Sequence, residues 1–250
     1  MFFPIHGAGV CDTQHVQPGH HVSDFVVSSY VPTLSILTLP PNSSAPPSGD
    51  LRLLAVRQPS SDGLPRLSGV DTELTHIKEV IRDPTSAHIT LLESSDGTVE
   101  EVLSLTKEAD WVHFACHGIQ DDVNSGLCLA DRRCLKLRDI VAMSRPHGEL
   151  AFLSACQTAM GDGGLPDEAI HITAGMLFAG YGGVVGTMWK ISDELAPRVA
   201  RDVYGQLFRN GTRPDYREAA RALHEAIGRV RHTSSNASFV EWLPFIHVGL

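Results

Sequence analysis

The chain has 250 residues, with 20 Lys plus Arg against 29 Asp plus Glu and a formal net charge of -9 at pH 7. An acidic chain of this kind lacks the basic surface that phosphate neutralisation requires, which excludes nucleic acid as an expected partner. Apolar residues make up 42% of the chain, enough for a sizeable core in one large domain or two small ones. Arginines gather at 198–231, but acidic residues accompany them, which favours a solvated helix surface.

The five cysteines form an odd set without repeated CxxC spacing, which argues against a disulfide framework. The first residues have no basic start and are interrupted by Pro4 and His6, so no secretory signal is expected and a cytoplasmic location is predicted. The uncharged stretch 169–189 is long enough to cross a membrane. Its glycines, among them Gly180 and Gly183, divide it into a helix, a turn and a buried strand, so no membrane span is expected.

Apolar runs and helical patterns alternate along the chain. The runs lack clean alternation, as in strands buried on both faces, and lie at 24–30, 51–57, 88–92, 110–116, 149–156 and 183–189. The helical patterns cover 70–81, 99–108, 137–143, 167–181, 194–209 and 214–230. This order predicts an α/β fold with a mostly parallel sheet. The segment 40–49 holds four prolines and is interpreted as a surface loop, because the residues before it are too few for a core of their own.

Two residues with chemistry of their own follow neighbouring strands in the sequence. One strand runs into His117 and Gly118, and the next runs into Cys156. Because the carboxyl ends of parallel strands gather at one edge of a sheet, an imidazole there could generate a thiolate for nucleophilic attack. Position alone leaves Cys156 open to a functional or a structural reading. Packing is the favoured interpretation of the other cysteines weighed with it, Cys116, Cys128 and Cys134.

Two groups of histidines lie close together in the sequence and are candidate metal ligands. On a strand His113 and His117 share a face while Cys116 points away, which disfavours one metal bound by all three. The histidines at 15, 20 and 21 lie in an irregular segment, so no metal site is predicted and a metal-dependent hydrolase remains the weakest alternative. The chain has no P-loop, GxGxxG or GxSxG motif, so no cofactor is expected.

The blocks WVHFACHG (111–118) and LAFLSACQTAMG (150–161) resemble the two signature blocks of the CHAT domain, a caspase-like cysteine peptidase domain commonly found with tetratricopeptide repeats. The segments 23–37, 167–197 and 242–250 also resemble that family, especially its fungal members. The resemblance implies a caspase-haemoglobinase-like three-layer α/β sandwich with a mostly parallel central sheet flanked by helices.

The resemblance also implies a function. His117 would be the general base and acid and Cys156 the nucleophile, while the backbone N–H groups of Gly118 and Cys156 would form the oxyanion hole. The chain would be a cysteine endopeptidase that hydrolyses a protein substrate in a regulatory or cell-death pathway. An acidic residue in the P1 pocket would favour Arg or Lys, and Asp162 and Asp193 are candidates by position. The alternative for Asp193 is a helix N-cap.

The chain departs from the family at its start. Relatives usually have one more strand before the segment 2–9, and repeats upstream that receive an activating partner. We expect residues 1–250 to form a single CHAT domain without its first strand, with a tetratricopeptide-repeat sensor as a partner or a lost upstream region. The competing hypothesis is a catalytically silent interaction or scaffold module with a caspase-like fold.

Overall fold

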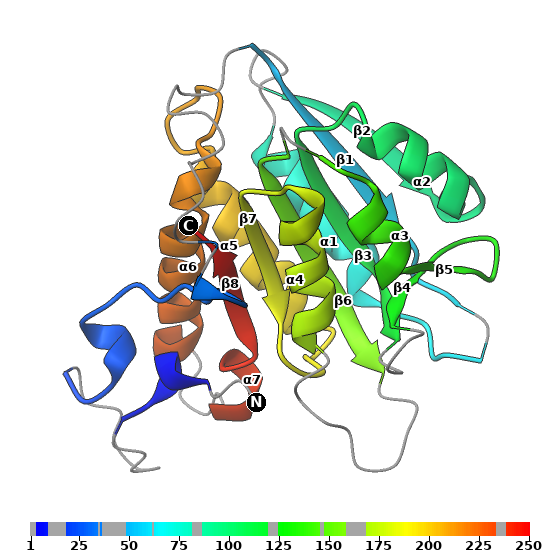
Figure 1. Cartoon of the computed structure of the whole chain (residues 1–250). Helices are drawn as coiled ribbons and strands as arrows, with labels where there is room; N and C mark the ends of the chain where they lie inside the picture. The colour runs from blue at the N-terminus through cyan, green and yellow to red at the C-terminus, as the bar shows by residue number, and fades with distance from the viewer. Residues whose placement is uncertain are drawn as a thin grey trace.

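The computed structural model describes residues 4–9, 19–34, 36, 49–61, 63–81, 87–119, 125–145, 148–158, 169–233 and 239–250; for residues 155–158, 169–171, 232–233 and 239 this covers the backbone alone. Within these residues one sheet has the strand order β2-β1-β3-β6-β7-β8 (Figure 1). Its strands are β1 (Leu51–Arg57), β2 (Ala87–Glu93), β3 (Trp111–Ile119), β6 (Leu150–Thr158), β7 (Gly183–Thr187) and β8 (Phe245–Gly249). All neighbouring pairs on this path are parallel except β7 and β8, so the sheet is mostly parallel, as predicted.

A short hairpin extends the sheet at the carboxyl end of β3. It consists of β4 (Gly126–Cys128) and β5 (Cys134–Lys136), which pair antiparallel to each other. Strand β4 also pairs antiparallel with β3, where Gly118 lies opposite Leu127. The hairpin therefore contacts the strand that carries His117.

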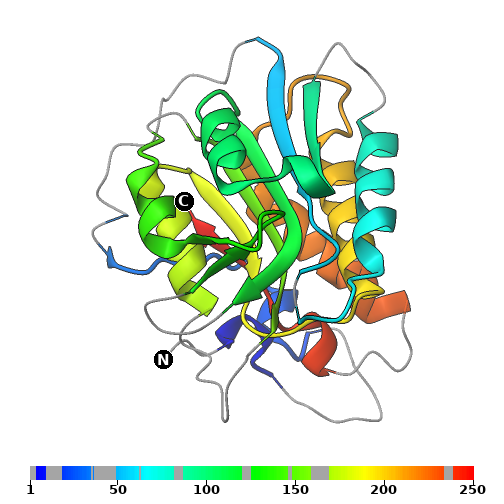
Figure 2. The same ribbon diagram turned by 90° about the vertical axis from the view of Figure 1, so that its right-hand side faces the viewer.

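Helices cover both faces of the sheet. One face packs against α1 (Gly69–Val80), α5 (Leu195–Leu207) and α6 (Ala219–Thr233), and the other against α2 (Val99–Thr106), α3 (Leu137–Ala142) and α4 (Ala169–Ala179). A last short helix, α7 (Phe239–Trp242), precedes β8. Figure 2 shows the three layers with the sheet between its helices. The predicted three-layer α/β architecture is confirmed.

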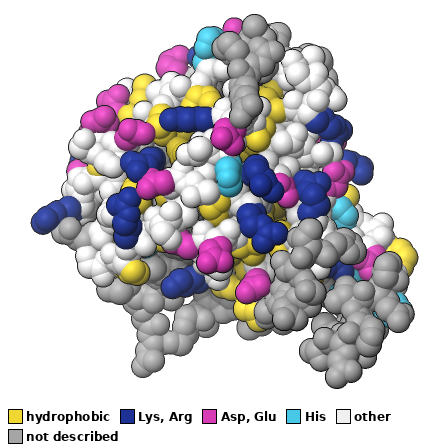
Figure 3. Space-filling model, turned by 180° about the vertical axis from the view of Figure 1, so that it is seen from behind, with side chains coloured by type: hydrophobic (Ala, Val, Ile, Leu, Met, Phe, Trp, Pro, Cys, Tyr) yellow, Lys and Arg dark blue, Asp and Glu magenta, His cyan; other side chains and the backbone are white. Residues whose placement is uncertain are grey.

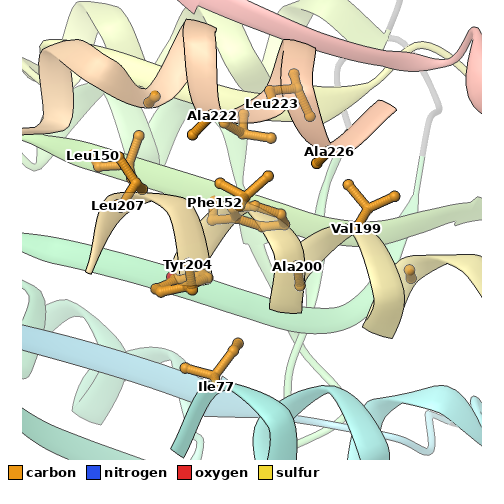
Figure 4. Packing of buried hydrophobic residues seen from close by; sticks show 14 of the residues in the cluster. Ile77, Leu150, Phe152, Val199, Ala200, Tyr204, Leu207, Ala222, Leu223 and Ala226 are labelled. Carbon is orange, nitrogen blue, oxygen red and sulfur yellow. The ribbon is translucent and has the colours of Figure 1, made fainter. Parts of the chain in front are cut away.

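The central strands are apolar on both sides, which explains their continuous apolar runs. In β3 the side chains of Trp111 and Ala115 belong to the core beneath α1 and α5, whereas Val112 and Phe114 belong to the core beneath α2 and α4. Figure 4 shows the first of these cores, where Phe152 of β6 and Tyr204 of α5 lie among side chains from α1 and α6.

The predicted strand at 24–30 is wrong. Its first residue ends a short 3-10 helix (Val22–Asp24), and its last, Tyr30, forms an isolated bridge to Val248 of β8. The side chains of Phe25 and Val26 are 74% and 49% exposed, so these apolar residues do not pack into the core as those of a buried strand would. Strand β8 and the hairpin are additional to the predicted elements.

Helix α4, a turn at Gly180 and strand β7 confirm the interpretation of 169–189, and no described helix is long and apolar enough to cross a membrane. Of the proline-rich segment 40–49, all but Gly49 lies outside the described residues.

On the side of the molecule opposite to Figure 1, Lys and Arg side chains are mixed with Asp and Glu (Figure 3). Within 198–231, Arg201 and Arg229 both pair with Asp202, as a solvated helix surface would.

Candidate functional site

The register of β3 and β6 brings the two candidate catalytic positions together. The strands are parallel neighbours, and the Cα partner of His117 is Cys156. Both residues lie within the last three positions of their strands, at the carboxyl edge of the sheet. Of Cys156 the structure describes the backbone alone. The expected adjacency of these two strand ends is therefore present, at the level of the backbone.

The imidazole of His117 is held in one orientation by the loop after β1. It is fully buried, and its Nε2 lies 2.9 Å from the carbonyl oxygen of Pro65. Because a carbonyl oxygen can only accept, Nε2 must carry the proton of the neutral ring. Among the described residues Nδ1 has no hydrogen-bond partner. The neutral ring thus keeps an unused lone pair on Nδ1, which is what a general base needs.

The surroundings of His117 favour that neutral form. Burial lowers the pKa of His117 below its usual value, and the positive charge of Lys190 lowers it further. The hydrogen bond to Pro65 and the carboxylate of Asp193 act in the opposite direction but do not cancel the effect of burial. At neutral pH the ring is therefore uncharged and able to accept a proton.

Asp193 ties the loop after β7 to the start of α1. Its Oδ2 accepts hydrogen bonds from the backbone N–H and the hydroxyl of Ser68, at 2.6 and 2.9 Å. The N-cap of α5 is Glu194, so the helix N-cap expected for Asp193 is wrong. The carboxylate instead joins two loops that contribute to the surroundings of His117. The other candidate pocket residue, Asp162, lies outside the described residues.

A buried polar network lies one level deeper in the sheet. Glu73 of α1 accepts a hydrogen bond from the hydroxyl of Ser154 at 2.8 Å, and its other carboxylate oxygen lies 3.3 Å from Nε2 of His113. The Nδ1 of His113 lies 3.2 Å from the hydroxyl of Tyr204 in α5. Burial, with a contribution from the nearby Glu73 carboxylate, raises the pKa of Tyr204 and keeps it a neutral phenol.

This network joins the strands that carry His117 and Cys156 to helices α1 and α5. His113 precedes His117 by four residues on β3, so these two side chains lie on the same face of the sheet, and Ser154 precedes Cys156 by two residues on β6. Sequence reasoning missed Glu73, although a signal exists. It follows Val70 by three residues and precedes Ile77 by four, so its position belongs to the buried stripe of α1.

The remaining predicted residues fall as follows. Gly118 lies inside β3, between Gln157 of β6 and Leu127 of β4. The side chain of Cys116 belongs to the core on the face opposite to that of His113 and His117, as the strand geometry predicted. No group of three metal-ligating side chains occurs among the described residues.

A pocket of about 370 Å³ lies elsewhere, between the N-terminal segment, α6 and β8. Its lining includes His6, Arg231 and His247 but neither His117 nor any residue that contacts it. Its volume therefore says nothing about the strand ends of β3 and β6.

Comparisons with known proteins concern the family and the fold of the chain. A family model described as the CHAT domain matches residues 12–250. No curated protein sequence matches the chain. Among solved structures, the Saccharomyces cerevisiae separase–securin complex is similar, with a TM-score of 0.51 and 14% identity, and the match covers 80% of this chain and 12% of that chain.

The Arg-specific cysteine proteinase gingipain R is also similar, with a TM-score of 0.49 and 9% identity over 79% of this chain and 46% of that chain. The Porphyromonas gingivalis complex of RgpB pro- and mature domains has a TM-score of 0.48 and 10% identity, over 80% of this chain and 47% of that one. At these identities the likeness to separase concerns the fold alone. The caspase-like α/β fold expected from the resemblance is confirmed, and because the family model matches nearly the whole sequence, the chain belongs to the CHAT domain family.

Proposed function

We propose that the chain is a cysteine endopeptidase that uses His117 and Cys156 as a catalytic dyad. The observation that carries the proposal is the register of β3 and β6, which pairs these two residues at the carboxyl ends of parallel strands. The unused lone pair on Nδ1 of His117 supports it. A peptidase fold with a base and a thiol at one sheet edge has the minimum set of groups for this reaction.

In the proposed reaction, Nδ1 of His117 takes the proton of the Cys156 thiol, and the thiolate attacks the carbonyl carbon of the scissile peptide bond. The imidazolium then donates its proton to the leaving amine as the C–N bond breaks, which leaves a thioester. Water, deprotonated by the same imidazole, hydrolyses the thioester and regenerates the thiol. The N–H groups of Gly118 and Cys156 stay the predicted donors to the oxyanion.

The test is hydrolysis of fluorogenic peptides that carry Arg, Lys or Asp at P1. We expect Cys156→Ala and His117→Ala each to lower kcat/KM at least about a thousandfold, as loss of a catalytic group does in other covalent hydrolases. Cys116→Ala is the matched control, because Cys116 precedes His117 by one residue but faces the opposite core. It should retain activity. Equal turnover by Cys156→Ala and the unmodified chain would show that another group carries the hydrolysis.

We further propose that Asp193 contributes to P1 selection, as its position after β7 and its charge near His117 suggest. Asp193→Asn should then lower kcat/KM for P1 Arg and Lys by a larger factor than for an uncharged P1 residue, for which only the effect on His117 remains. An equal loss for every peptide would assign Asp193 only the structural contact with Ser68.

The substrate is proposed to be a protein of a regulatory or cell-death pathway, and a tetratricopeptide-repeat sensor is the proposed activating partner. If the chain hydrolyses none of these peptides, alone or with such a partner, the alternative is favoured. The domain would then be a silent interaction module, and Cys156→Ala would preserve whatever assembly it supports.

A further inference from the structure

Two thiols lie opposite each other on the hairpin beside the candidate active site. The Sγ atoms of Cys128 and Cys134 are 3.4 Å apart, and the two residues are partners in the β4–β5 register. The same hairpin pairs with β3 at Gly118. A disulfide bond is about 2.05 Å long, so the two sulfurs need only a short approach to become bonded.

The hydrogen-bond pattern of the hairpin suits such a bond. The N–H of Leu129 donates to the carbonyl of Arg133, and the N–H of Leu137 donates to the carbonyl of Ser125, each at 2.9 Å. Hydrogen-bonded and non-hydrogen-bonded pairs alternate along an antiparallel ladder, so Cys128 and Cys134 fall at a non-hydrogen-bonded pair. Cα atoms of such pairs are about 4.5 Å apart, inside the span of about 4.4–6.8 Å that disulfides bridge.

The two thiols differ in exposure. Cys128 is only 5% exposed, whereas Cys134 is partly exposed and lies in the wall of a shallow hollow of about 560 Å³. Four cationic side chains and one carboxylate also line this hollow: Arg132, Arg133, Lys136, Arg138 and Asp139. Arg133 pairs with Glu100 and Asp131. A reagent from solvent therefore reaches Cys134 first, and the basic lining suits an anionic one.

The two thiols also differ in acidity. The hydrogen bond with Cys128 lowers the pKa of Cys134 to about 7, with help from the charge of Lys136, while burial and Asp131 oppose this change. The same hydrogen bond, together with burial, raises the pKa of Cys128. Near neutral pH Cys134 therefore carries thiolate character while Cys128 donates its S–H to it.

We propose that Cys128 and Cys134 form a reversible dithiol–disulfide couple that is oxidised by a small anionic disulfide such as oxidised glutathione. The thiolate of Cys134 attacks one sulfur of the oxidant, a mixed disulfide forms on Cys134, and one glutathione thiolate leaves. Cys128 then gives its proton to the released glutathione thiolate and attacks the sulfur of Cys134, which closes the protein disulfide and releases the second glutathione as a thiolate. Two electrons pass from the protein thiols to the oxidant.

The chain offers a direct assay for this bond, because trypsin cleaves after Arg132 and Arg133, between the two thiols. The full-length Cys156→Ala protein, which has no candidate nucleophile, is equilibrated in glutathione redox buffers, alkylated and digested. We expect the peptide that contains Cys128 to stay joined to the one that contains Cys134 until a reductant is added. Cys128→Ala and Cys134→Ala should abolish the joined pair.

The peptide with Cys128 also contains Cys116, which lies close enough to Cys128 to contribute to its raised pKa. If the bond joins Cys128 to Cys134, Cys116→Ala should retain the joined pair. Fragmentation of the joined peptides from the parent protein assigns the bond even if this core variant does not fold. In Cys128→Ala, which also removes the hydrogen bond that lowers the pKa of Cys134, one glutathione should still accumulate on Cys134 at least about tenfold faster than on Cys128 in Cys134→Ala, because Cys134 is the more exposed thiol.

A bond between Cys116 and Cys128, full alkylation of both hairpin thiols at every buffer ratio, or faster modification of Cys128 would each overturn the proposal. The assay measures no hydrolysis and uses a protein without Cys156. Failure of the couple and failure of the proposed peptidase are therefore distinguishable.

Discussion

The two ring nitrogens of His117 have different surroundings. Nε2 is bonded to the Pro65 carbonyl, and besides burial, which has the largest effect, the charges of Asp193 and Lys190 act on the pKa of the ring in opposite directions. A backbone carbonyl thus orients the ring where other hydrolases use a carboxylate, so the proposed dyad requires no third, acidic residue.

The first prediction concerns these two charges. Asp193→Asn should lower the pKa of His117 further, because it removes a negative charge that raises this pKa. Lys190→Gln should raise the pKa of His117, because it removes a positive charge that lowers it. The measurement is an NMR titration of the His117 ring in the full-length protein, which needs no activity. Shifts of the same sign in both variants would show that loop rearrangement, not charge, controls the ring.

The second prediction concerns Glu73, whose carboxylate is 1% exposed and contacts Ser154 and His113. Glu73→Gln keeps the shape but removes the charge from a buried network, so we expect a loss of about 2–4 kcal/mol in the free energy of unfolding. Glu79→Gln is the control, because Glu79 lies on the exposed side of the same helix. It should change stability by no more than about 0.5 kcal/mol. Equal midpoints in denaturant for the two variants would contradict the prediction.

Residues with a sequence signal were predictable and residues without one were not. His117 and Cys156 follow apolar runs, which is why their place at one sheet edge could be predicted. Glu73 could have been found from its spacing in the apolar stripe of α1. Pro65 could not, because it acts through a backbone carbonyl and any residue supplies one.

At the scale of elements, the contact between α1 and the loop after β7 depends on Gly69. A Cβ atom at this position would overlap the carbonyl oxygen of Asp193. The two loops that surround His117 are therefore close because the first residue of α1 has no side chain.

The third prediction follows from this contact. Gly69→Ala should lower the free energy of unfolding by about 1–3 kcal/mol, because backbone has to move to relieve the overlap. Gly205→Ala is the matched control, because Gly205 lies inside α5 and has nothing within 4 Å of the added atom. It should raise stability by about 0.5–1 kcal/mol. Thermal unfolding of both variants measures whether their stabilities change in opposite directions. If Gly69→Ala is stabilised as Gly205→Ala is, the backbone contact at Gly69 does not limit the side chain at this position.

The elements that the sequence predicted are those long enough to leave a signal. Strands β1, β3 and β6 span seven to nine residues and form continuous apolar runs, and α5 spans thirteen residues with a helical period, whereas β4 and β5 have three residues each, too few for either signal to show. The error at 24–30 has a different cause. An apolar run indicates that a segment prefers burial, but a strand also needs a neighbouring strand with which to form hydrogen bonds. This segment forms a single bridge with β8, at Tyr30.

At the scale of the whole molecule, burial lowers the pKa of three histidines that lie far apart in the sequence. They are His6, which contacts Tyr30 and the carbonyl of Leu243, His117, and His247 of β8. The pKa of His247 falls to about 4. Its Nδ1 lies 2.8 Å from the Ser29 hydroxyl, which in turn donates to the carbonyl of Gly249. The folded chain therefore resists protonation of three imidazoles, two of which, His6 and His247, line the same pocket.

The last prediction is that these sites make the fold acid-sensitive. An unfolded histidine takes up a proton near pH 6.5, but the folded chain holds His247 neutral down to about pH 4. The free energy of unfolding is thus undiminished above pH 6.5 and falls as the pH drops toward 4, where His247 alone accounts for a loss of about 3 kcal/mol.

His247→Asn keeps a donor near Ser29 and should flatten the profile of unfolding free energy against pH by that amount. His88→Asn, which removes an exposed imidazole beside Asp50, is the comparison variant. If His247→Asn and the unmodified chain give parallel profiles in denaturant from pH 7.5 to 4.5, buried His247 is not a source of acid sensitivity.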